Sequence, residues 1–188
     1  MLYVPNKFLF IHIPRSAGNA VTRTLAEELV SHRDIVVGTS HGAILWRHMP
    51  VWAVYKNLQI GAAERQRIQI VVIKRDEDEV IRSDWRLFKA IEGDIKQFEH
   101  HPFYHKLIAA RESYGAFRQT WDVLLDGKSM VDWWCPPQYW PWVIPYEQLD
   151  DHWPDLCKAA GCESVPTLLR TDFQLVEVKR QRFQEPTT

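Results

Sequence analysis

A short segment near the start of the chain has the composition of an anion-binding loop. It reads Pro14-Arg15-Ser16-Ala17-Gly18-Asn19-Ala20-Val21 and follows the apolar run Phe8-Leu9-Phe10-Ile11. A strand that leads through small residues into a helix directs backbone N–H groups outward, and the helix dipole favours a negative charge there. The pattern predicts a pocket for a phosphate or sulfate group; the simpler alternative is an ordinary strand-to-helix turn.

A second segment supplies a guanidinium and a hydroxyl group for the same kind of ligand. Arg75 follows the apolar run Ile68–Ile73, and Ser83 lies two helical turns beyond Asp76. Ligands of open α/β sheets bind at the carboxyl ends of the strands, and arginine offers charged, forked donors to a phosphate. We therefore expect Arg75 and Ser83 to converge on one phosphate. The alternative is an exposed arginine held by Asp76, with a serine that faces solvent.

Other chemistries find less support in the sequence. The ATP-binding loop pattern requires a lysine and a hydroxyl residue after its last glycine, whereas Gly18 is followed by Asn19-Ala20. A metal-dependent phosphotransferase is therefore a minor alternative, and no metal site is predicted. The three cysteines lack CxxC spacing, so we expect reduced thiols rather than a zinc site or a disulfide framework; they are Cys135, Cys157 and Cys162.

Alternating strands and helices must position these groups. Apolar runs predict strands at 7–13, 34–37, 68–73 and 142–145. Helices are expected at 22–32, at 42–58 in two pieces divided near Pro50, from Asp76 onward, after Pro102 in one long element, and at 151–160. Asp76 and Glu79 have the spacing of a capping box at the start of one helix. The order predicts a three-layer α/β/α domain with a central, mostly parallel sheet over residues 1–175, and a tail at 176–188.

Composition restricts the partners. The chain has 188 residues, of which 46% are apolar and 25% charged, with a formal net charge of −1. Such a balance gives no global field for nucleic acid, so any anion site must be local. No apolar run approaches the ~18 residues of a membrane span. We expect no membrane span and no nucleic-acid partner, and a cytoplasmic location; the sequence leaves the oligomeric state open.

Taken together, the motifs resemble those of sulfotransferases. Pro14–Val21 resembles their 5′-phosphosulfate loop, and Lys74-Arg75-Asp76 with Ser83 and Trp85 is similar to their 3′-phosphate motif. Tyr146-Glu147-Gln148-Leu149 is similar to the [YF]E[DN]L segment of many members, and Pro137-Gln138 fits the carbohydrate-sulfotransferase-like branch. The resemblance spans roughly residues 8–160.

The resemblance implies a P-loop NTPase-like sulfotransferase fold and transfer of a sulfuryl group from 3′-phosphoadenosine-5′-phosphosulfate (PAPS), without a metal, to a hydroxyl or amine. The sequence does not identify the acceptor; a glycan, a lipid head group and a small metabolite are all compatible with it. By the same resemblance, the 5′-phosphosulfate is held by Arg15, Ser16, Ala17, Gly18, Asn19, Ala20 and Val21. Arg75 and Ser83 hold the 3′-phosphate. Arg15 stands in the place of the family's usual lysine and is therefore also a catalytic candidate.

An acceptor hydroxyl needs a general base, and histidine is the usual candidate at neutral pH. His41 matches a K-H-x-x-A-like segment of related bacterial members and is the predicted catalytic base; a helix-capping or surface histidine is the alternative. His48 is the next candidate, and His12 is expected to pack within the sheet. Because Arg15 and Asn19 depart from the family pattern, a catalytically impaired nucleotide-binding or interaction module on the same fold is the alternative function.

Overall fold

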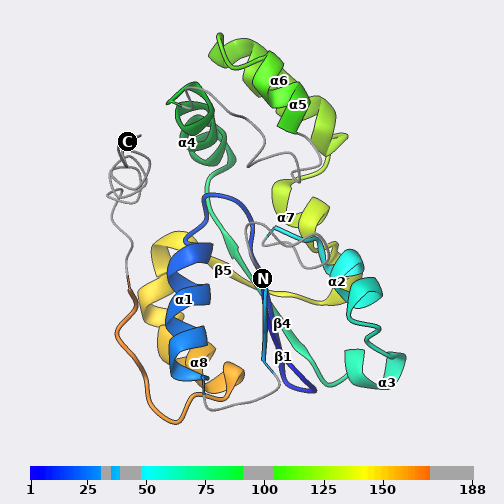
Figure 1. Cartoon of the computed structure of the whole chain (residues 1–188), viewed down its shortest axis with the longest axis vertical. Helices are drawn as coiled ribbons and strands as arrows, with labels where there is room; N and C mark the ends of the chain where they lie inside the picture. The colour runs from blue at the N-terminus through cyan, green and yellow to red at the C-terminus, as the bar shows by residue number, and fades with distance from the viewer. Residues whose placement is uncertain (31–34, 39–47, 91–103, 170–188) are drawn as a thin grey trace, which may run out of the picture.

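The computed structural model describes residues 1–30, 35–38, 48–90 and 104–169, and its centre is one five-stranded sheet (Figure 1). The strand order is β3-β1-β2-β4-β5. The strands are β1 (Leu2–Val4), β2 (Phe8–Ile11), β3 (Val36–Val37), β4 (Gln69–Lys74) and β5 (Trp142–Pro145). The expected strands at 68–73 and 142–145 are therefore confirmed.

The sheet is mixed, because β1 runs against its neighbours. β2 pairs in parallel with β4, and β4 in parallel with β5, whereas β1 is antiparallel to both β2 and β3. A tight turn at 5–7, in which Asn6 has a φ of 57°, connects β1 to β2 as a hairpin. The expected mostly parallel sheet is thus confirmed only from β2 to β5. Strand β1 was not predicted, since three residues are too few to show a periodicity.

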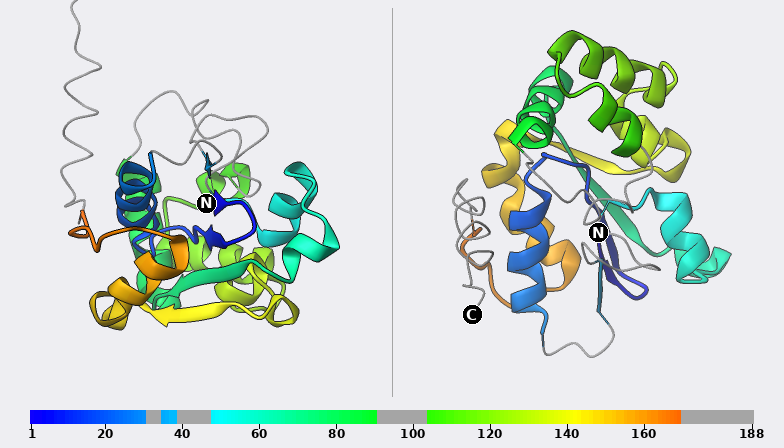
Figure 2. Two further views of the ribbon diagram at one scale, coloured as in Figure 1. Left: turned by 90° about the horizontal axis from the view of Figure 1, so that it is seen from below. Right: turned by 45° about the horizontal axis from the view of Figure 1, so that its top comes forward.

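Helices cover both faces of this sheet (Figure 2). On one face lie α1 (Gly18–Glu28) and α8 (Leu149–Ala160). The other face carries α2 (Val51–Asn57), α4 (Glu77–Ala90), α5 (Tyr104–Ala109), α6 (Tyr114–Leu125) and α7 (Met130–Trp134). The short helix α3 (Ala62–Arg65) precedes β4, and 3₁₀ turns at Pro137–Tyr139 (η2) and Tyr146–Gln148 (η3) flank β5. This arrangement has the three layers that the sequence predicted.

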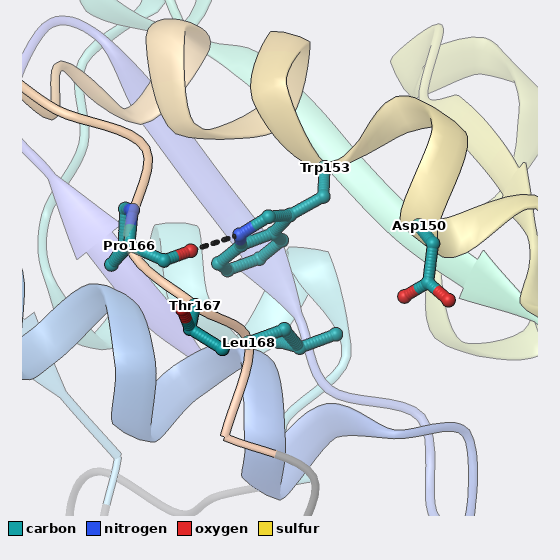
Figure 3. Close-up of a pocket in the computed structure, with 5 residues that line it drawn as sticks. All are labelled: Asp150, Trp153, Pro166, Thr167 and Leu168. Atoms are coloured by element: carbon teal, nitrogen blue, oxygen red, sulfur yellow. Dashed lines mark hydrogen bonds between the residues drawn. The ribbon is translucent and has the colours of Figure 1, made fainter.

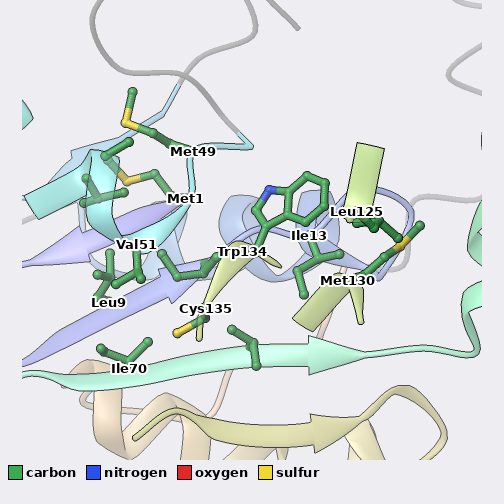
Figure 4. Close-up of a cluster of buried hydrophobic side chains, with 14 of the residues drawn as sticks. Met1, Leu9, Ile13, Met49, Val51, Ile70, Leu125, Met130, Trp134 and Cys135 are labelled. Carbon is green, nitrogen blue, oxygen red and sulfur yellow. The ribbon is translucent and has the colours of Figure 1, made fainter. Parts of the chain in front are cut away.

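The two faces bury different side chains because successive strand residues point to opposite sides. On the α1/α8 face, Phe8 and Phe10 of β2 pack with Val21, Leu25 and Trp153. On the opposite face, Leu9 and Ile11 pack among methionines and aromatic rings, and the indole of Trp134 lies at the centre of Figure 4. Apolar contact on both faces fixes β2 and β4, whose carboxyl ends carry the two predicted motifs.

Several helix boundaries differ from the predictions. The first helix begins at Gly18, not at residue 22, so half of the predicted phosphate loop forms the first helical turn. The prediction of one long helix after Pro102 is wrong, because α5 ends at Ala109 and a separate helix, α6, begins at Tyr114. Ser113 caps α6, since its hydroxyl accepts a hydrogen bond from the N–H of Ala116. The closing helix ends at Gly161, as expected.

Some predictions fall outside the described residues. These are the helical piece at 42–47, the candidate base His41 and the tail at 176–188. Of the helices that the structure describes, none combines the length and the apolar character needed to cross a bilayer.

Candidate functional site

The turn between β2 and α1 has an unusual backbone conformation. Arg15 and Ala17 have φ values of 60° and 57°, in the left-handed region that L-residues other than asparagine and aspartate seldom adopt. Such a conformation costs roughly 1–2 kcal/mol per residue and is concentrated at functional sites. The N-cap residue of α1, Ala17, provides no side-chain cap, and the first turn of the helix contains no acidic residue. The positive end of the helix dipole therefore lies at this turn without a carboxylate of the first turn to neutralise it.

Gly18 is required at the first position of α1 because the His12 ring lies against it. A Cβ atom at position 18 would be 1.8 Å from Cδ2 of His12, far inside van der Waals contact. His12 is buried, as predicted, but it follows β2 instead of lying within it. Its ring also contacts the His48 ring, with 4.4 Å between the centroids. A buried imidazole thus supports the start of the helix from behind.

Two hydrogen bonds join this turn to the second motif. Nε of Arg15 donates to Oγ of Ser83 over 2.9 Å, and Nη1 of Arg75 donates to the carbonyl oxygen of Arg15 over 3.2 Å. The structure therefore brings Arg15, Arg75 and Ser83 together, as their places after two parallel strands predict. The arrangement differs in one respect: the hydroxyl of Ser83 is bonded to Arg15, whereas the hydrogen bonds of Arg75 go to Glu79 and to the Arg15 carbonyl oxygen.

The third motif supplies a contact that the sequence did not reveal. The guanidinium carbon of Arg75 lies 4.9 Å from the centroid of the Tyr146 ring. Register explains the contact: Lys74 of β4 pairs with Pro145 of β5, so the next residue of each strand reaches the same edge. The Tyr-Glu-Gln-Leu pattern was noted in the sequence, but nothing there assigned the ring to Arg75.

Glu79 also differs from its expected role. Asp76 caps α4 as predicted, because its Oδ1 accepts from the N–H of Glu79 over 3.0 Å. The Glu79 carboxylate does not complete a capping box; it accepts from Nε of Arg75 over 3.0 Å. The pair leaves Arg75 one quarter exposed and Glu79 more than half exposed, so water screens the attraction.

Asp84 is a buried carboxyl group behind the site. It is only 4% exposed and shares the buried stripe of α4 with Val80 and Phe88. Burial raises the pKa of Asp84 to about 7, and the positive charge of Arg15 opposes part of that rise. The sequence signal was its spacing, four residues after Val80 and four before Phe88. Because aspartate is seldom fully buried, an aspartate at this spacing is normally assigned to the exposed side of a helix. The spacing alone therefore did not identify Asp84 as buried.

The remaining residues of the predicted anion-binding loop offer main-chain groups to a ligand more than side-chain groups. The hydroxyl of Ser16 is buried and donates to the carbonyl oxygen of Pro14 over 3.3 Å. The side chains of Ala20 and Val21 are buried, while Asn19 is exposed. Among these predicted ligands, we therefore expect contact with an anion to come mainly from main-chain N–H groups.

A separate hollow of about 600 Å³ lies beside α8 and the segment that follows it (Figure 3). Its walls are formed by Asp150, Trp153, Pro166, Thr167 and Leu168, and the Trp153 indole donates to the Pro166 carbonyl oxygen over 2.6 Å. The one ionisable group in this lining is acidic. The hollow is therefore unsuited to phosphate, and it shares no residue with the motifs described above.

Comparison with known proteins adds nothing to this geometry: no family model, no curated protein and no solved structure matches the chain. Within the described ranges, no group of three or more His, Cys, Asp or Glu side chains could hold a metal ion. The cluster at the carboxyl edge of β2, β4 and β5 is therefore interpreted from its own chemistry. We refer to Arg15, Ser83, Arg75, Tyr146 and the start of α1 as the carboxyl-edge cluster.

Proposed function

We propose that the carboxyl-edge cluster binds the bisphosphate nucleotide of PAPS, and that the protein transfers its sulfuryl group to a hydroxyl acceptor. The observation that carries this proposal is the 3.2 Å hydrogen bond from Nη1 of Arg75 to the carbonyl oxygen of Arg15. It joins two segments that would each hold one phosphate. A nucleotide phosphorylated on both its 3′ and 5′ positions needs two such anion sites on one surface.

The residues present fit such a nucleotide. The start of α1 has outward N–H groups, a positive dipole end and no acidic residue in its first turn, which suits the 5′-group. The Arg75 guanidinium has five N–H donors, more than its contacts with Glu79 and the Arg15 carbonyl use. Tyr146 covers its face, so its plane is restrained before a ligand arrives.

The chain's own residues would contribute charge and orientation. PAPS, when bound, supplies the activated sulfuryl group. The N–H groups of the first turn of α1 stabilise negative charge that develops on the leaving phosphate oxygens, as preorganised donors do. Arg15 adds a positive charge but holds its proton too firmly to donate it. We retain His41 as the base that would accept the acceptor's proton.

One observation favours the second candidate function, a nucleotide-binding module without turnover. Nε of Arg15 already donates to Ser83, so this guanidinium is partly engaged where the family's lysine would serve the leaving group. Binding of the bisphosphate nucleotide without sulfuryl transfer to any of a panel of hydroxyl acceptors would favour the module over the enzyme.

Calorimetry with adenosine 3′,5′-bisphosphate and with adenosine 5′-phosphate tests the nucleotide assignment. Arg75→Ala should weaken bisphosphate binding roughly tenfold or more, as expected for a lost charged contact, and should leave the monophosphate nearly unchanged. Arg82→Ala is the matched control: it removes a guanidinium from α4, the helix that follows Arg75, but one that pairs with Asp78 and lies over the Tyr114 ring. Equal losses for the two nucleotides, or no binding by the intact protein, would refute the assignment.

A further inference from the structure

Two cysteines meet at the carboxyl end of α8, in a turn of defined geometry. Gly161 ends the helix with a φ of 94°, its N–H donates to the Lys158 carbonyl over 3.1 Å, and the Cys162 N–H donates to the Cys157 carbonyl over 3.0 Å. These two bonds define a Schellman motif, in which the side chains at the positions of Cys157 and Cys162 characteristically contact each other.

The two thiols are in contact and differ in access. A side-chain hydrogen bond joins the thiols of Cys157 and Cys162. Cys157 is buried in the core of the α1/α8 face, while Cys162 is partly exposed at its margin. Lys7 packs on this turn, since a Cβ at Gly161 would lie 2.4 Å from its Nζ, and Glu28 is the acidic neighbour. The pair therefore has an accessible thiol with a second thiol behind it.

We propose that Cys157 and Cys162 form a reversible disulfide, which makes the end of α8 a modification site for low-molecular-weight disulfides such as glutathione disulfide. The Cys162 thiolate attacks one sulfur of the glutathione disulfide, which yields a mixed disulfide and one glutathione thiolate. The Cys157 thiolate then attacks the Cys162 sulfur and releases the second glutathione. Two protein thiols are oxidised, one small disulfide is reduced to two thiols, and the two thiol protons pass to the departing glutathiones.

The electrostatic surroundings predict slow formation and persistence of this bond. Burial raises the pKa of Cys157 to about 12 and, with Glu28, also raises the pKa of Cys162, whereas the Cys157 hydrogen bond and Lys7 partly oppose the shift at Cys162. Few thiolates exist at neutral pH, so oxidation should accelerate as the pH rises. A site that does not stabilise the thiolate also gives a disulfide of low reduction potential, which resists reduction once formed.

Cys135 provides an internal control. It is fully buried, but in the core of the opposite face of the sheet, among the residues of Figure 4. The sheet separates it from the α8 pair, so it should neither join the disulfide nor react in the folded protein. The site also lies away from the carboxyl-edge cluster, beside the turn that precedes β2, and the inference does not depend on the proposed function.

Oxidation of the full chain in glutathione buffers at pH 8.5 tests the inference directly. After acid quenching, denaturation and alkylation, trypsin cleaves after Lys158 and leaves Cys157 and Cys162 in separate peptides. We expect a mass loss of two hydrogens, loss of alkylation at both residues, and two peptides joined by a disulfide. Fragmentation of the Cys157 peptide should find the alkyl label on Cys135. Full alkylation of all three cysteines in the most oxidising buffer would overturn the proposal.

Single substitutions separate the two roles. Cys157→Ser should trap glutathione on Cys162 as a lasting mixed disulfide, and Cys162→Ser should prevent any adduct because Cys157 is buried. Cys135→Ser, the matched control, should leave the disulfide unchanged. A lasting glutathione adduct on Cys162 of the unaltered chain, or a bond to Cys135, would contradict the inference. Both readouts on the unaltered chain remain decisive if a substitution prevents folding.

Discussion

The two turns that flank β2 both contain residues in the left-handed backbone conformation, but the residue types differ. Before the strand, Asn6 takes the left-handed conformation, which asparagine tolerates, and its N–H donates to Oε1 of Glu64 over 3.0 Å. After the strand, Arg15 and Ala17 take that conformation without any such preference, and the chain then enters α1. Agreement between residue and backbone indicates a structural turn, whereas their conflict at the second turn indicates a functional one.

The carboxylates beside these turns differ in the same way. Glu64, near the first turn, accepts hydrogen bonds from the Tyr3 hydroxyl and from the Asn6 N–H, so its charge is compensated by donors. Asp84, near the second, is buried more deeply, and the charge of Arg15 compensates it only in part. Glu64, at the amino edge of β2, therefore stabilises the fold. The buried carboxyl group of Asp84, near the carboxyl edge, lowers the unfolding free energy as it ionises near neutral pH.

The largest effect should come from Gly18→Ala. The new methyl group would collide with the His12 ring, which is buried and also contacts the His48 ring, so the ring or α1 must shift. We expect a loss of about 3 kcal/mol in unfolding free energy, at the upper end of the usual cost of overpacking, measured by urea denaturation. Gly115→Ala, in α6, is the control, because its nearest neighbour would be 3.8 Å away. Equal stability of the two variants would show that His12 does not support the helix start.

Asp84→Asn should stabilise the protein at neutral and higher pH, whereas most substitutions of buried residues lower the unfolding free energy. The native pKa of about 7 exceeds the unfolded value of 3.8, so the native state binds the extra proton between those pH values. The stability from this proton is present at pH 4 and is lost as the pH rises through 7. Asparagine removes the loss, so at pH 8 the variant should be more stable by a few kcal/mol, with little difference at pH 4.

Glu64→Gln is the comparison from the amino edge. It should lower stability by about 1 kcal/mol at pH 8, because a carboxylate that accepts two hydrogen bonds is lost there. Urea denaturation of both variants at pH 4, 6 and 8 distinguishes the two carboxylates. A destabilised Asp84→Asn variant at pH 8 would mean that Asp84 is compensated as fully as Glu64.

Tyr146→Leu should weaken nucleotide binding by a smaller factor. If the ring restrains the Arg75 guanidinium, its removal should reduce affinity for adenosine 3′,5′-bisphosphate about threefold, the value of one partly exposed cation–π contact. Tyr146→Phe keeps the ring and should bind like the unaltered protein. Calorimetry measures both; an equal loss in the two variants would assign the effect to the hydroxyl instead of the ring.

The smallest expected effect is a difference in stability between a glycine substitution in the second turn and one in the first. Ala17→Gly relieves a strained residue and should stabilise the protein by about 0.5 kcal/mol, after the greater flexibility of the unfolded chain is subtracted. Asn6→Gly should give no gain, since asparagine is already suited to its turn. Thermal unfolding of the two variants compares them, and a gain at position 6 as large as at position 17 would remove the contrast.

Elements with strong local signals were predictable from the sequence. The apolar runs of β4 and β5, and the glycine that ends α8, each satisfy a local preference that the fold also requires. The break between α5 and α6, at residues 110–113, was missed because the apolar residues of the two helices recur at steps of three and four across it. Strand β1 gains its stability from pairing with two neighbours, a contact that three residues cannot reveal.

The part of the site that follows directly from the ends of neighbouring parallel strands was predictable from the sequence. Arg15 and Arg75 follow parallel neighbours, so their proximity could be deduced before their contact was seen. The contact of Tyr146, which completes the cluster, depends on the register of β5, and the burial of Asp84 behind the cluster depends on the rotation of α4. Those are properties of tertiary packing, which local residue patterns do not encode.

Backbone NMR titration of the full chain tests the central claim most directly, namely that two distant segments hold one bisphosphate nucleotide. Adenosine 3′,5′-bisphosphate should shift the amide signals at the start of α1 and the Nε–H signal of Arg75, whereas adenosine 5′-phosphate should shift the α1 signals alone. Shifts confined to the hollow around Trp153, or an Arg75 signal that neither nucleotide moves, would contradict the account.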